Sequence, residues 1–411
     1  MRIVVVGQGA REHALALNLS AEHEVVVTPG NAGMASDVEV SDCDVAELGP
    51  DLAVIGPEAP LVDGLADRLR QRGVLALGPS GAGARLEGSK AFLKQICAEA
   101  QVPTAAFGVA TSVAEGRELL DRFGPPYVIK TDGLAAGKGV LVTDDRGEAE
   151  EDLVAKLSGV SFGEAGTRVV IEEGMTGREL SVFALCNGRD FVLLPEARDY
   201  KRLLDDDLGP NTGGMGSISP VPGVGHDEIQ AVASTMIAPT LARLQELGIE
   251  YRGILYAGVM LTPSGPRLVE YNVRFGDPEA EVVLPRILGG LGDALAAAAA
   301  GEPIPMVKVS SQCATTVILA APGYPEAPVS GQIITGIDAA RALPGVWVYA
   351  AGVKGLGPTD RREVTSLVTN GGRVLAVTGR GDDPEEARSR AYQGVELIDF
   401  DGRLYRRDIG S

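Results

Sequence analysis

The sequence predicts a multidomain protein in which an α/β domain is followed by α+β domains. The chain of 411 residues is too long for one ordinary core, and 45% of its residues are hydrophobic, enough to fill several cores. Strand and helix patterns alternate at the start of the chain, whereas short strands with one helix near Pro384 follow Pro305. We therefore expect an N-terminal domain over residues 1–88, a central unit over 89–305 and a C-terminal α+β domain over 306–411.

The N-terminal domain is expected to be an open parallel sheet. Residues 2–6 (RIVVV) have the pattern of a buried strand and Ala10 to Leu19 that of a helix. The segments VVVT, DLAVIG and VLALG then recur with helical or small-residue segments between them. Continuous apolar strands that alternate with helices are typical of parallel sheets, because the helices cover both faces.

Composition and charge exclude several classes of function. The formal net charge of −19 argues against general binding of nucleic acid or of anionic membranes, because the long-range field would repel them. Any anionic ligand must therefore be met by local cations. The opening MRIVVVGQGA is too short in its apolar run for a signal peptide or a membrane span. We expect a cytoplasmic protein with no membrane or nucleic-acid partner.

Cysteine and histidine are not expected to carry the chemistry. The four cysteines stand singly, without a CxxC pair, which argues against a disulfide framework and against a thiolate zinc site. The three histidines share no motif with a partner residue, which disfavours a histidine-based triad or metal site. The candidate groups are therefore Lys, Arg, Asp, Glu and the backbone.

The segment GQGARE directly follows the first predicted strand. Its helix-start N–H groups, with Gly9 in the turn and Arg11 beside it, are placed to bind a phosphate. A dinucleotide fingerprint would need Gly or Ala where Glu12 stands, and no acidic residue closes the VVVT strand, so an NAD site is disfavoured. Two interpretations remain, a phosphate site for a smaller ligand and a tight strand-to-helix turn without a ligand.

The segment KTDGLAAGKG has the composition of a phosphate-binding loop but not the spacing of a P-loop. Three residues separate Gly133 from Gly137, and Gly139 follows Lys138 where a P-loop has Ser or Thr. The flanking PYVIK and VLVT are strand patterns, which predict a flap between two strands that covers nucleotide phosphates. Lys130 and Lys138 would supply the charge. A glycine-rich hairpin with solvated lysines is the alternative.

The segment LVEYNVRFGDPE predicts a row of polar groups. Successive side chains of a strand alternate between faces, so Glu270, Asn272 and Arg274 share one face. A carboxylate and an amide oxygen two residues apart suit Mg²⁺, and an arginine beside them can bind phosphate oxygens. An edge strand with one solvated face is the alternative.

Two further segments carry weaker signals. In VVIEEGMTGRELSVF, Glu172 and Glu173 end one strand pattern and Glu179 starts the next, so this segment can present groups to an adenine edge and to ribose hydroxyls. In GPNTGGMGS, the backbone around Gly213 and Gly214 offers several N–H groups to an anion. A solvated acidic hairpin and a glycine-rich surface turn are the alternatives.

Taken together, these segments resemble the phosphoribosylamine–glycine ligase family, also called glycinamide ribonucleotide synthetases, of the ATP-grasp superfamily. The resemblance runs nearly from end to end and is carried by GxGxREHAL at 7–15, PGNAG at 29–33, GPEAPLVDG at 56–64, LEGSKAF at 86–92, VIKTDGLAAGKGV at 128–140, KRLLDDDLGPNTGGMG at 201–216, EYNVRFGDPEAEVVLPR at 270–286, PGYP at 322–325 and TNGGRVLAV at 369–377. The chain departs from the family pattern at Ala10, Thr131, Tyr200 and the VYAAGV segment at 348–353.

The resemblance implies a fold and an ATP site. The central unit would be an ATP-grasp unit whose small lobe, at about 105–172, carries the flap. The residues implied to bind ATP are Lys90, Lys130, Gly133, Gly137, Lys138, Gly139, Glu172, Glu173, Glu179 and Arg274. The implied metal ligands, for Mg²⁺ or Mn²⁺, are Glu270 and Asn272.

The resemblance also implies the substrates, which are glycine and 5-phosphoribosylamine. The residues implied to face them are Gly9, Arg11, Asn31, Gly56, Glu58, Asp199, Lys201, Gly213 and Gly214. Arg274, Lys130 and Asp277 are the catalytic candidates, and the choice between Asp199, Asp277 and a substrate phosphate as acceptor of the amine proton stays open. The implied reaction passes through glycyl phosphate in purine biosynthesis, and we expect a monomer.

The sequence disfavours three other functions. Another carboxylate–amine ligase of the superfamily is disfavoured by the GPEAPL and GREHAL-like segments. A nucleotide sensor without catalysis would not need the metal row at Glu270. A dehydrogenase is disfavoured by the broken dinucleotide fingerprint.

Overall fold

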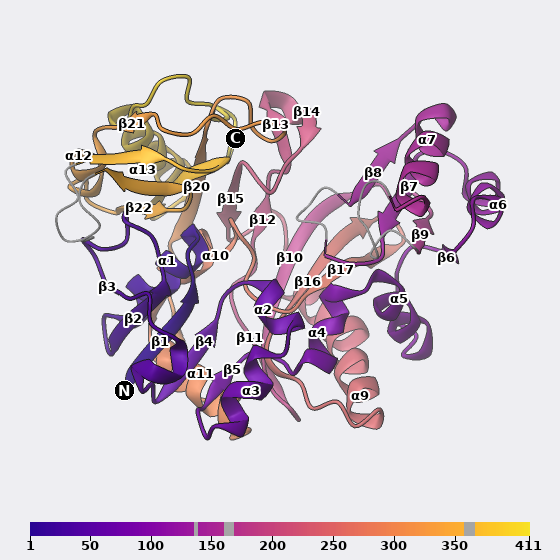
Figure 1. Cartoon of the computed structure of the whole chain (residues 1–411), viewed down its shortest axis with the longest axis horizontal. Helices are drawn as coiled ribbons and strands as arrows, with labels where there is room; N and C mark the ends of the chain where they lie inside the picture. Colours follow the sequence, from indigo (N-terminus) through magenta and orange to yellow (C-terminus); the bar gives the residue numbers. More distant parts are fainter. Residues whose placement is uncertain (135–138, 160–167, 357–365) are drawn as a thin grey trace.

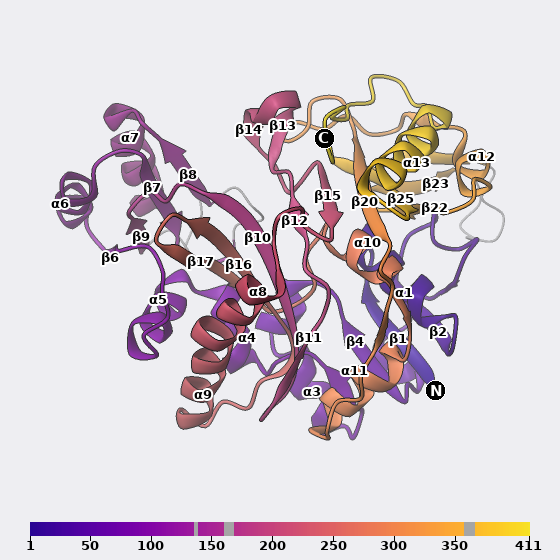
Figure 2. The ribbon, with the colours of Figure 1, turned by 180° about the vertical axis from the view of Figure 1, so that it is seen from behind.

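The computed structural model describes residues 1–134, 139–159, 168–356 and 366–411. Figure 1 shows the N-terminal sheet at the lower left, the C-terminal domain above it and a small lobe projecting on the right. A longer sheet made of β10, β16 and β17 lies between them, and the view from behind shows the same arrangement (Figure 2). The chain therefore has the predicted combination of an α/β domain with α+β domains.

The N-terminal domain is an open parallel sheet, as predicted. Its strand order is β3-β2-β1-β4-β5, and every pairing is parallel. Its elements are β1 (Arg2–Gly7), α1 (Ala10–Leu19), β2 (Glu24–Pro29), β3 (Glu39–Val40), β4 (Leu52–Ile55), α2 (Glu58–Val62), α3 (Leu65–Gln71) and β5 (Ala76–Leu77). The carboxyl ends of β1 and β4 lie side by side, which brings the turn after Gly7 next to Gly56.

The small lobe is an antiparallel sheet in the order β6-β9-β7-β8. Its elements are β6 (Phe107–Ala110), α6 (Val113–Phe123), β7 (Tyr127–Thr131), β8 (Val140–Thr143), α7 (Arg146–Leu157) and β9 (Val169–Glu172). Ile129, Leu120 and Leu153 belong to a hydrophobic core of its own. β7 and β8 form the predicted hairpin at the base of the flap. Gly137 and Lys138 lie outside the described residues.

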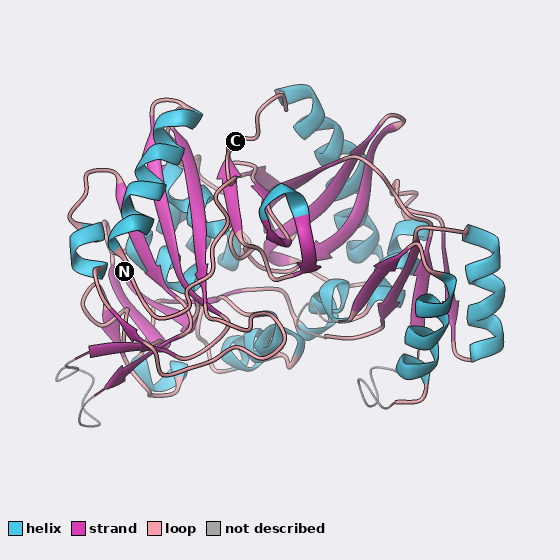
Figure 3. Cartoon of the chain, turned by 90° about the horizontal axis from the view of Figure 1, so that it is seen from above, coloured by secondary structure: helices cyan, strands magenta, loops and turns pink. Residues whose placement is uncertain are grey.

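The large lobe is built on the antiparallel sheet β11-β10-β16-β17. Its elements are α4 (Gly81–Gly88), α5 (Lys90–Glu99), β10 (Arg178–Asn187), β11 (Phe191–Leu193), α8 (His226–Val232), α9 (Ala238–Glu246), β16 (Arg252–Thr262), β17 (Gly265–Asn272), α10 (Ala280–Val283) and α11 (Leu291–Ala300). Seen from above, the small lobe stands apart at one end of this sheet (Figure 3). Two short pairs, β13 (Arg202–Leu204) with β14 (Leu208–Asn211) and β18 (Ile287–Gly289) with β19 (Lys308–Val309), complete it.

The C-terminal sheet takes two strands from the central part of the chain. Its order is β12-β15-β20-β25-β22, where β12 (Arg198–Asp199) and β15 (Gly216–Ser219) precede β20 (Cys313–Ala320), β22 (Val346–Ala350) and β25 (Arg373–Gly381). A smaller sheet joins β21 (Ile333–Ile334), β24 (Ser366–Thr369) and β23 (Val353–Leu356), and the helices are α12 (Ile337–Arg341) and α13 (Pro384–Leu397). The domain boundaries near residues 88 and 305 stay predictions. The second boundary does not separate the sheets, because β15 from before residue 305 pairs with β20 from after it.

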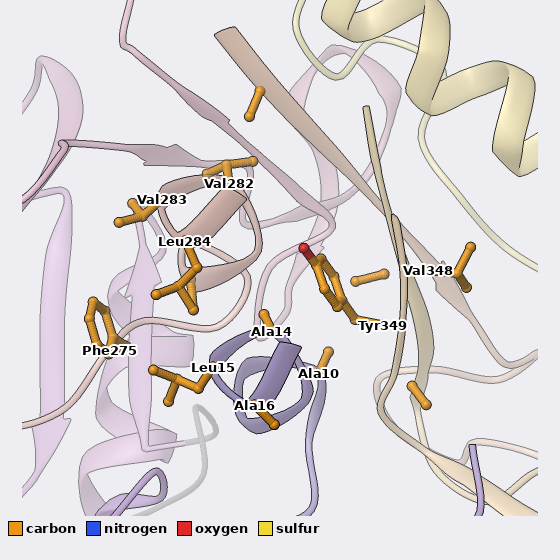
Figure 4. Packing of buried hydrophobic residues seen from close by; sticks show 14 of the residues in the cluster. Ala10, Ala14, Leu15, Ala16, Phe275, Val282, Val283, Leu284, Val348 and Tyr349 are labelled. Carbon is orange, nitrogen blue, oxygen red and sulfur yellow. The ribbon is translucent and has the colours of Figure 1, made fainter. Parts of the chain in front are cut away.

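Helix α1 joins the three parts of the molecule. Figure 4 shows Ala14 and Leu15 of α1 packed between Leu284 after α10 and Tyr349 of β22. All four belong to one buried cluster that draws on each part of the chain. Burial of such side chains stabilises the molecule by roughly 1.5 to 3 kcal/mol each for the larger ones. The turn at the start of α1 is thereby fixed relative to the ATP-grasp unit.

No helix among the described residues is long and apolar enough to cross a membrane.

Candidate active site

Strand β17 presents the predicted polar row. Glu270 and Asn272 lie on one face, opposite Gly258 and Tyr256 of β16. The Lys90 ammonium, at the start of α5, lies 2.9 Å from Glu270 Oε2, and Arg274 donates to Asn272 Oδ1 at 3.1 Å. Lys90 is the main reason that the pKa of the Glu270 carboxyl is far below its ordinary value, and it outweighs burial. Glu270 is therefore a carboxylate throughout the neutral range.

Glu172 ends β9 between two buried lysines. Its carboxylate lies 2.9 Å from Lys130 Nζ and 3.0 Å from Lys94 Nζ. Burial alone would raise the pKa of Glu172, but Lys130 and Lys94 outweigh it and leave the pKa below its ordinary value. Lys130 also donates to the carbonyl of Val269, next to Glu270. Glu172 thus fixes the position of the predicted ATP-binding lysine of β7.

Arg274 connects the polar row to the N-terminal half of the chain. Its guanidinium lies 2.7 Å from Glu87 Oε1 and 3.3 Å from Glu58 Oε2. Burial raises the pKa of the Glu87 carboxyl although Arg274 opposes it, whereas Arg274 and Arg11 outweigh burial and lower the pKa of Glu58. Glu87 also accepts the backbone N–H of Val273 at 2.8 Å. These carboxylates hold Arg274 in one orientation beside Asn272.

Asp132 fastens the base of the flap to helix α5. Its Oδ1 accepts the Ser89 hydroxyl at 2.8 Å and the backbone N–H of Ala91 at 3.0 Å. Across the hairpin, the N–H of Thr131 donates to the carbonyl of Gly139 at 2.8 Å. Gly133 follows this anchored base, so the described part of the flap starts beside the helix that carries Lys90.

A second charged cluster lies between β10 and β12. Lys201 Nζ lies 3.0 Å from Asp199 Oδ1 and also pairs with Glu179. Burial would lower the pKa of Lys201, but Asp199 and Glu179 outweigh it and raise the pKa well above the ordinary value. Glu279, nearby and buried, accepts the Tyr256 hydroxyl at 2.6 Å, and burial followed by the charge of Asp199 raises its pKa. This cluster combines one cation with three carboxyl groups.

Glu12 fills the turn between β1 and α1. Its Oε2 accepts the N–H of Gly9 at 2.7 Å, and its Oε1 accepts from Arg11 at 2.7 Å. A Cβ atom at Gly56 would lie 2.2 Å from Glu12 Oε1, so a side chain at this position would displace the carboxylate. The N–H of Gly9, which a dinucleotide phosphate would need, is therefore bonded to Glu12 in this structure. Arg11 also donates to the carbonyl of Phe275 at 3.1 Å.

Asn31 and Gly56 lie on the same side of the N-terminal sheet as this turn. The Asn31 amide donates to the carbonyls of Gln8 at 2.8 Å and of Ala350 at 3.1 Å, and its oxygen accepts the N–H of Gly33. Asn31 is buried and ties the turn to β22 of the C-terminal domain. Its predicted contact with substrate stays a prediction.

Asp277 is held by an arginine of the C-terminal domain. Arg373 lies 3.0 Å from Asp277 Oδ1, and it donates to the carbonyls of Asp277 at 2.9 Å and of Gly213 at 2.5 Å. The N–H of Gly213 donates to the hydroxyl of Tyr324 at 3.0 Å. A Cβ at Gly214 would lie 2.4 Å from Pro278, so the GPNTGG segment packs directly on the turn at 276–278 that contains Asp277.

Three family models match successive parts of the chain. Those described as phosphoribosylglycinamide synthetase N domain, ATP-grasp (A) domain and C domain match residues 1–87, 88–280 and 314–411. The "Phosphoribosylamine--glycine ligase" of Leifsonia xyli is 44% identical over 428 residues, with 100% of both chains covered. The chain belongs to the phosphoribosylglycinamide synthetase family. A relative of the same name from Streptomyces coelicolor is 44% identical and covers 100% of this chain and 99% of its own.

Solved structures agree with this family assignment. The phosphoribosylamine–glycine ligase of Thermotoga maritima has a TM-score of 0.87 at 39% identity and covers 99% of this chain and 100% of its own. The biotin carboxylase domain of Hydrogenobacter thermophilus 2-oxoglutarate carboxylase has a TM-score of 0.73 at 16% identity and covers 98% of this chain and 91% of its own. The second likeness shows the fold alone.

In this phosphoribosylglycinamide synthetase family member, most of the predicted site residues fall into three groups. Glu179, Asp199 and Lys201 form the charged cluster between β10 and β12. Another group is linked by direct contacts or by a shared strand face and comprises Lys90, Lys130, Glu172, Glu270, Asn272 and Arg274. The last group surrounds the start of α1 and the turn at 276–278, and it comprises Gly9, Arg11, Gly56, Glu58, Asp277 and Gly213. The ion pair of Arg274 with Glu58 joins these two groups. Glu173 is separate. Its carboxylate accepts the N–H of Ala106 at 3.2 Å and lies 3.6 Å from Arg267.

Several charged side chains lie against or beside the predicted residues, although the predictions from sequence do not include them. Lys94 pairs with Glu172, Glu87 with Arg274 and Arg373 with Asp277, and the two partners of each pair lie far apart along the chain. Asp132 and Glu279 lie beside the predicted residues and bond to Ala91 and Tyr256. Arg373 stands in the TNGGRV segment and Glu279 in GDPE, so motif membership could have singled them out, but their partners could not be read from spacing.

Proposed function

We propose that the chain is an ATP-dependent ligase that joins glycine to 5-phosphoribosylamine, giving glycinamide ribonucleotide, ADP and phosphate in de novo purine biosynthesis. The observation that carries this is the full-length match to phosphoribosylamine–glycine ligases, together with Glu270 and Asn272 on one strand face. Arg274 follows the end of that strand and is bonded to Asn272, and Lys90 and Lys130 lie beside Glu270. We further propose that it works as a cytoplasmic monomer.

ATP would lie between the small and large lobes. Lys130 and Lys90 would face its phosphates, and the flap that begins at Asp132 would close over them. Glu172 would act mainly by holding Lys130, because both of its oxygens lie within ion-pair distance of buried ammonium groups. Glu173 and Glu179 stay as proposed contacts of the nucleoside.

The donor set fits a magnesium ion. Glu270 and Asn272 supply a carboxylate and an amide oxygen on one strand face, and Mg²⁺ commonly takes one or two protein ligands while water and substrate phosphates complete its shell. No group of three His, Cys, Asp or Glu residues that could hold a metal occurs in the described ranges, so the ion would depend on those phosphates. When bound, Mg²⁺ or Mn²⁺ would neutralise phosphate charge. Lys90 would then move from Glu270 to a phosphate oxygen.

The reaction needs no side-chain nucleophile. A glycine carboxylate oxygen attacks the γ-phosphorus of ATP, and the bond from that phosphorus to the β–γ bridging oxygen breaks, which gives ADP and glycyl phosphate. The amine of phosphoribosylamine then attacks the glycyl carbonyl carbon, and phosphate leaves as the amine loses a proton. Lys130 and Arg274 would stabilise the negative charge of the transferring group, and the closed flap would exclude water from the acyl phosphate.

The second substrate, phosphoribosylamine, would lie between the start of α1 and the turn at 276–278. Arg11 and the backbone around Gly9 would face its phosphoribosyl part, together with Asn31, Gly56 and Glu58. Asp199 and Lys201, or Asp277 held by Arg373, would face the amine and glycine. Three groups are candidates for the acceptor of the amine proton, namely Asp199, Asp277 and a phosphate oxygen of the substrate.

An omission assay tests the proposed function. ADP formation is measured with magnesium, glycine and freshly generated phosphoribosylamine, and each component is left out in turn. We expect steady ADP formation only with all of them, because the acyl phosphate is discharged by the amine. Full activity without phosphoribosylamine, or with a different amine in its place, would refute the substrate assignment.

A further inference from the structure

A cavity of about 310 Å³ lies behind the Lys201 cluster. It is lined by Arg178, Arg198, Tyr200, Ile218, Ser219, Pro220, Pro222, Cys313, Ala314, Thr315, Pro384, Gly410 and Ser411. These residues come from β10, β12, β15 and β20, with the start of α13 and the last residues of the chain, a junction that Figure 2 shows from behind. The volume is at the lower end of the range for small-molecule sites.

The cavity lies on the opposite side of the strands from the predicted substrate residues. Side chains alternate along a strand, so Arg178 points away from Glu179, and Arg198 away from Asp199. Glu179 and Asp199 meet at Lys201, whereas Arg178 and Arg198 line the cavity. The cavity is therefore a separate site and not an extension of the proposed active site.

The charged side chains in its lining are both positive. Arg178 and Arg198 are the charged side chains among the lining residues, and no carboxylate of the described residues forms an ion pair with either of them. Arg178 donates to the carbonyls of Pro222 at 3.2 Å and Gly223 at 3.3 Å, which leaves other guanidinium N–H groups to bind a ligand.

Arg198 is held in place by an aromatic stack. Its guanidinium lies 4.6 Å from the centre of the Tyr200 ring and donates to the Tyr200 hydroxyl at 2.5 Å. Arg406 lies on the same ring at 5.1 Å, and Tyr200 is buried. Arg406 is itself paired with Asp408 and Asp207. A guanidinium fixed in this way loses little freedom when it binds an anion.

We propose that this cavity binds the phosphate group of a small phosphate monoester. Two guanidinium groups match the charge of about −1.5 to −2 on a phosphate monoester, and planar guanidinium groups bind phosphate oxygens in pairs. Ile218, Pro220 and Pro222 supply an apolar wall for the organic part of the ligand. This site is independent of the ligase function, because none of its lining residues belongs to the proposed catalytic machinery.

The test compares three forms of the full-length chain by titration calorimetry. These are the unmodified chain, an Arg178→Gln/Arg198→Gln variant and an Arg122→Gln/Arg189→Gln control with the same change in net charge. Arg122 and Arg189 are exposed and lie outside the cavity. The probes are inorganic phosphate and glycerol 3-phosphate. Any binding at the proposed active site is common to all three forms and cancels in the comparison.

We expect the unmodified chain and the control to bind one phosphate group more than the cavity variant, whose affinity there should fall about tenfold or more. Tighter binding of glycerol 3-phosphate than of inorganic phosphate would assign the site to an organic monoester, and the reverse order would assign it to free phosphate. Identical isotherms for all three forms would overturn the proposal. If the double variant does not fold, Arg198→Lys, which keeps the charge but loses the paired geometry, should bind more weakly, and unchanged binding would contradict the site.

Discussion

Glu270→Gln is expected to lower magnesium-dependent ADP formation by about a hundredfold or more. The variant keeps the shape of the side chain but removes the only carboxylate that β17 offers beside Asn272 among the described residues. It also leaves the Lys90 ammonium without its partner at 2.9 Å. Steady-state ADP release at saturating glycine and phosphoribosylamine measures the loss, and a magnesium titration should show a higher metal requirement.

Folding and metal binding must be separated in this experiment. Far-UV circular dichroism and thermal melting check that Glu270→Gln is folded. Asn272→Asp, which keeps an oxygen at the second ligand position, should retain more activity than Asn272→Ala. Glu173→Gln removes a carboxylate that lies apart from the polar row. The magnesium concentration that this variant requires for ADP formation should therefore not change. Near-normal ADP release from folded Glu270→Gln would show that the metal assignment is wrong.

Glu172→Gln should reduce the free energy of unfolding by about 3 to 5 kcal/mol, the range found when one partner of a buried ion pair is removed. Glu172 is 2% exposed, and its loss leaves Lys94 and Lys130 buried without a counter-charge. Urea unfolding followed by circular dichroism measures the change. ADP formation should also fall, because Lys130 would no longer be fixed against β17.

The neighbouring Glu173→Gln is the matched control. Its side chain is 43% exposed and lies 3.6 Å from Arg267, so its loss should change stability by less than about 1 kcal/mol. Equal destabilisation by the two variants would contradict a special role for the buried Lys94–Glu172–Lys130 cluster.

The pH dependence of stability follows from the same cluster. Lys130 and Lys94 outweigh burial and hold the pKa of folded Glu172 below the ordinary value of 4.5. A lowered folded pKa gives stability that is present above the unfolded pKa and is lost as pH falls through the folded pKa. The unmodified chain should therefore lose stability more steeply than Glu172→Gln below about pH 4.5.

Local patterns were enough to predict the parallel sheet, the hairpin under the flap and the shared face of Glu270 and Asn272. Each depends on strand periodicity, and periodicity is a property of the neighbouring residues. The fold and the family were likewise confirmed. The flap tip, with Gly137 and Lys138, lies outside the described residues, so its closure stays a prediction.

Long-range pairing was not predictable from periodicity. Nothing in the spacing of the chain places Lys94 on Glu172, or Arg373 on Asp277, because these contacts depend on how separate elements pack. In the sequence, Glu12 is only the residue that breaks a dinucleotide fingerprint, whereas the structure shows its carboxylate bonded to the N–H of Gly9. In the same way, β12 and β15 join the C-terminal sheet across a boundary that composition places near residue 305.

The fate of the glycine oxygens tests the central claim most directly. Glycine labelled with ¹⁸O in its carboxylate is converted in the presence of ATP, magnesium and phosphoribosylamine, and the phosphate released is analysed by mass spectrometry. An acyl phosphate route transfers one labelled oxygen from glycine to each phosphate, because the glycyl carbon–oxygen bond breaks when the amine attacks. Release of unlabelled phosphate during formation of glycinamide ribonucleotide would contradict activation of glycine by ATP.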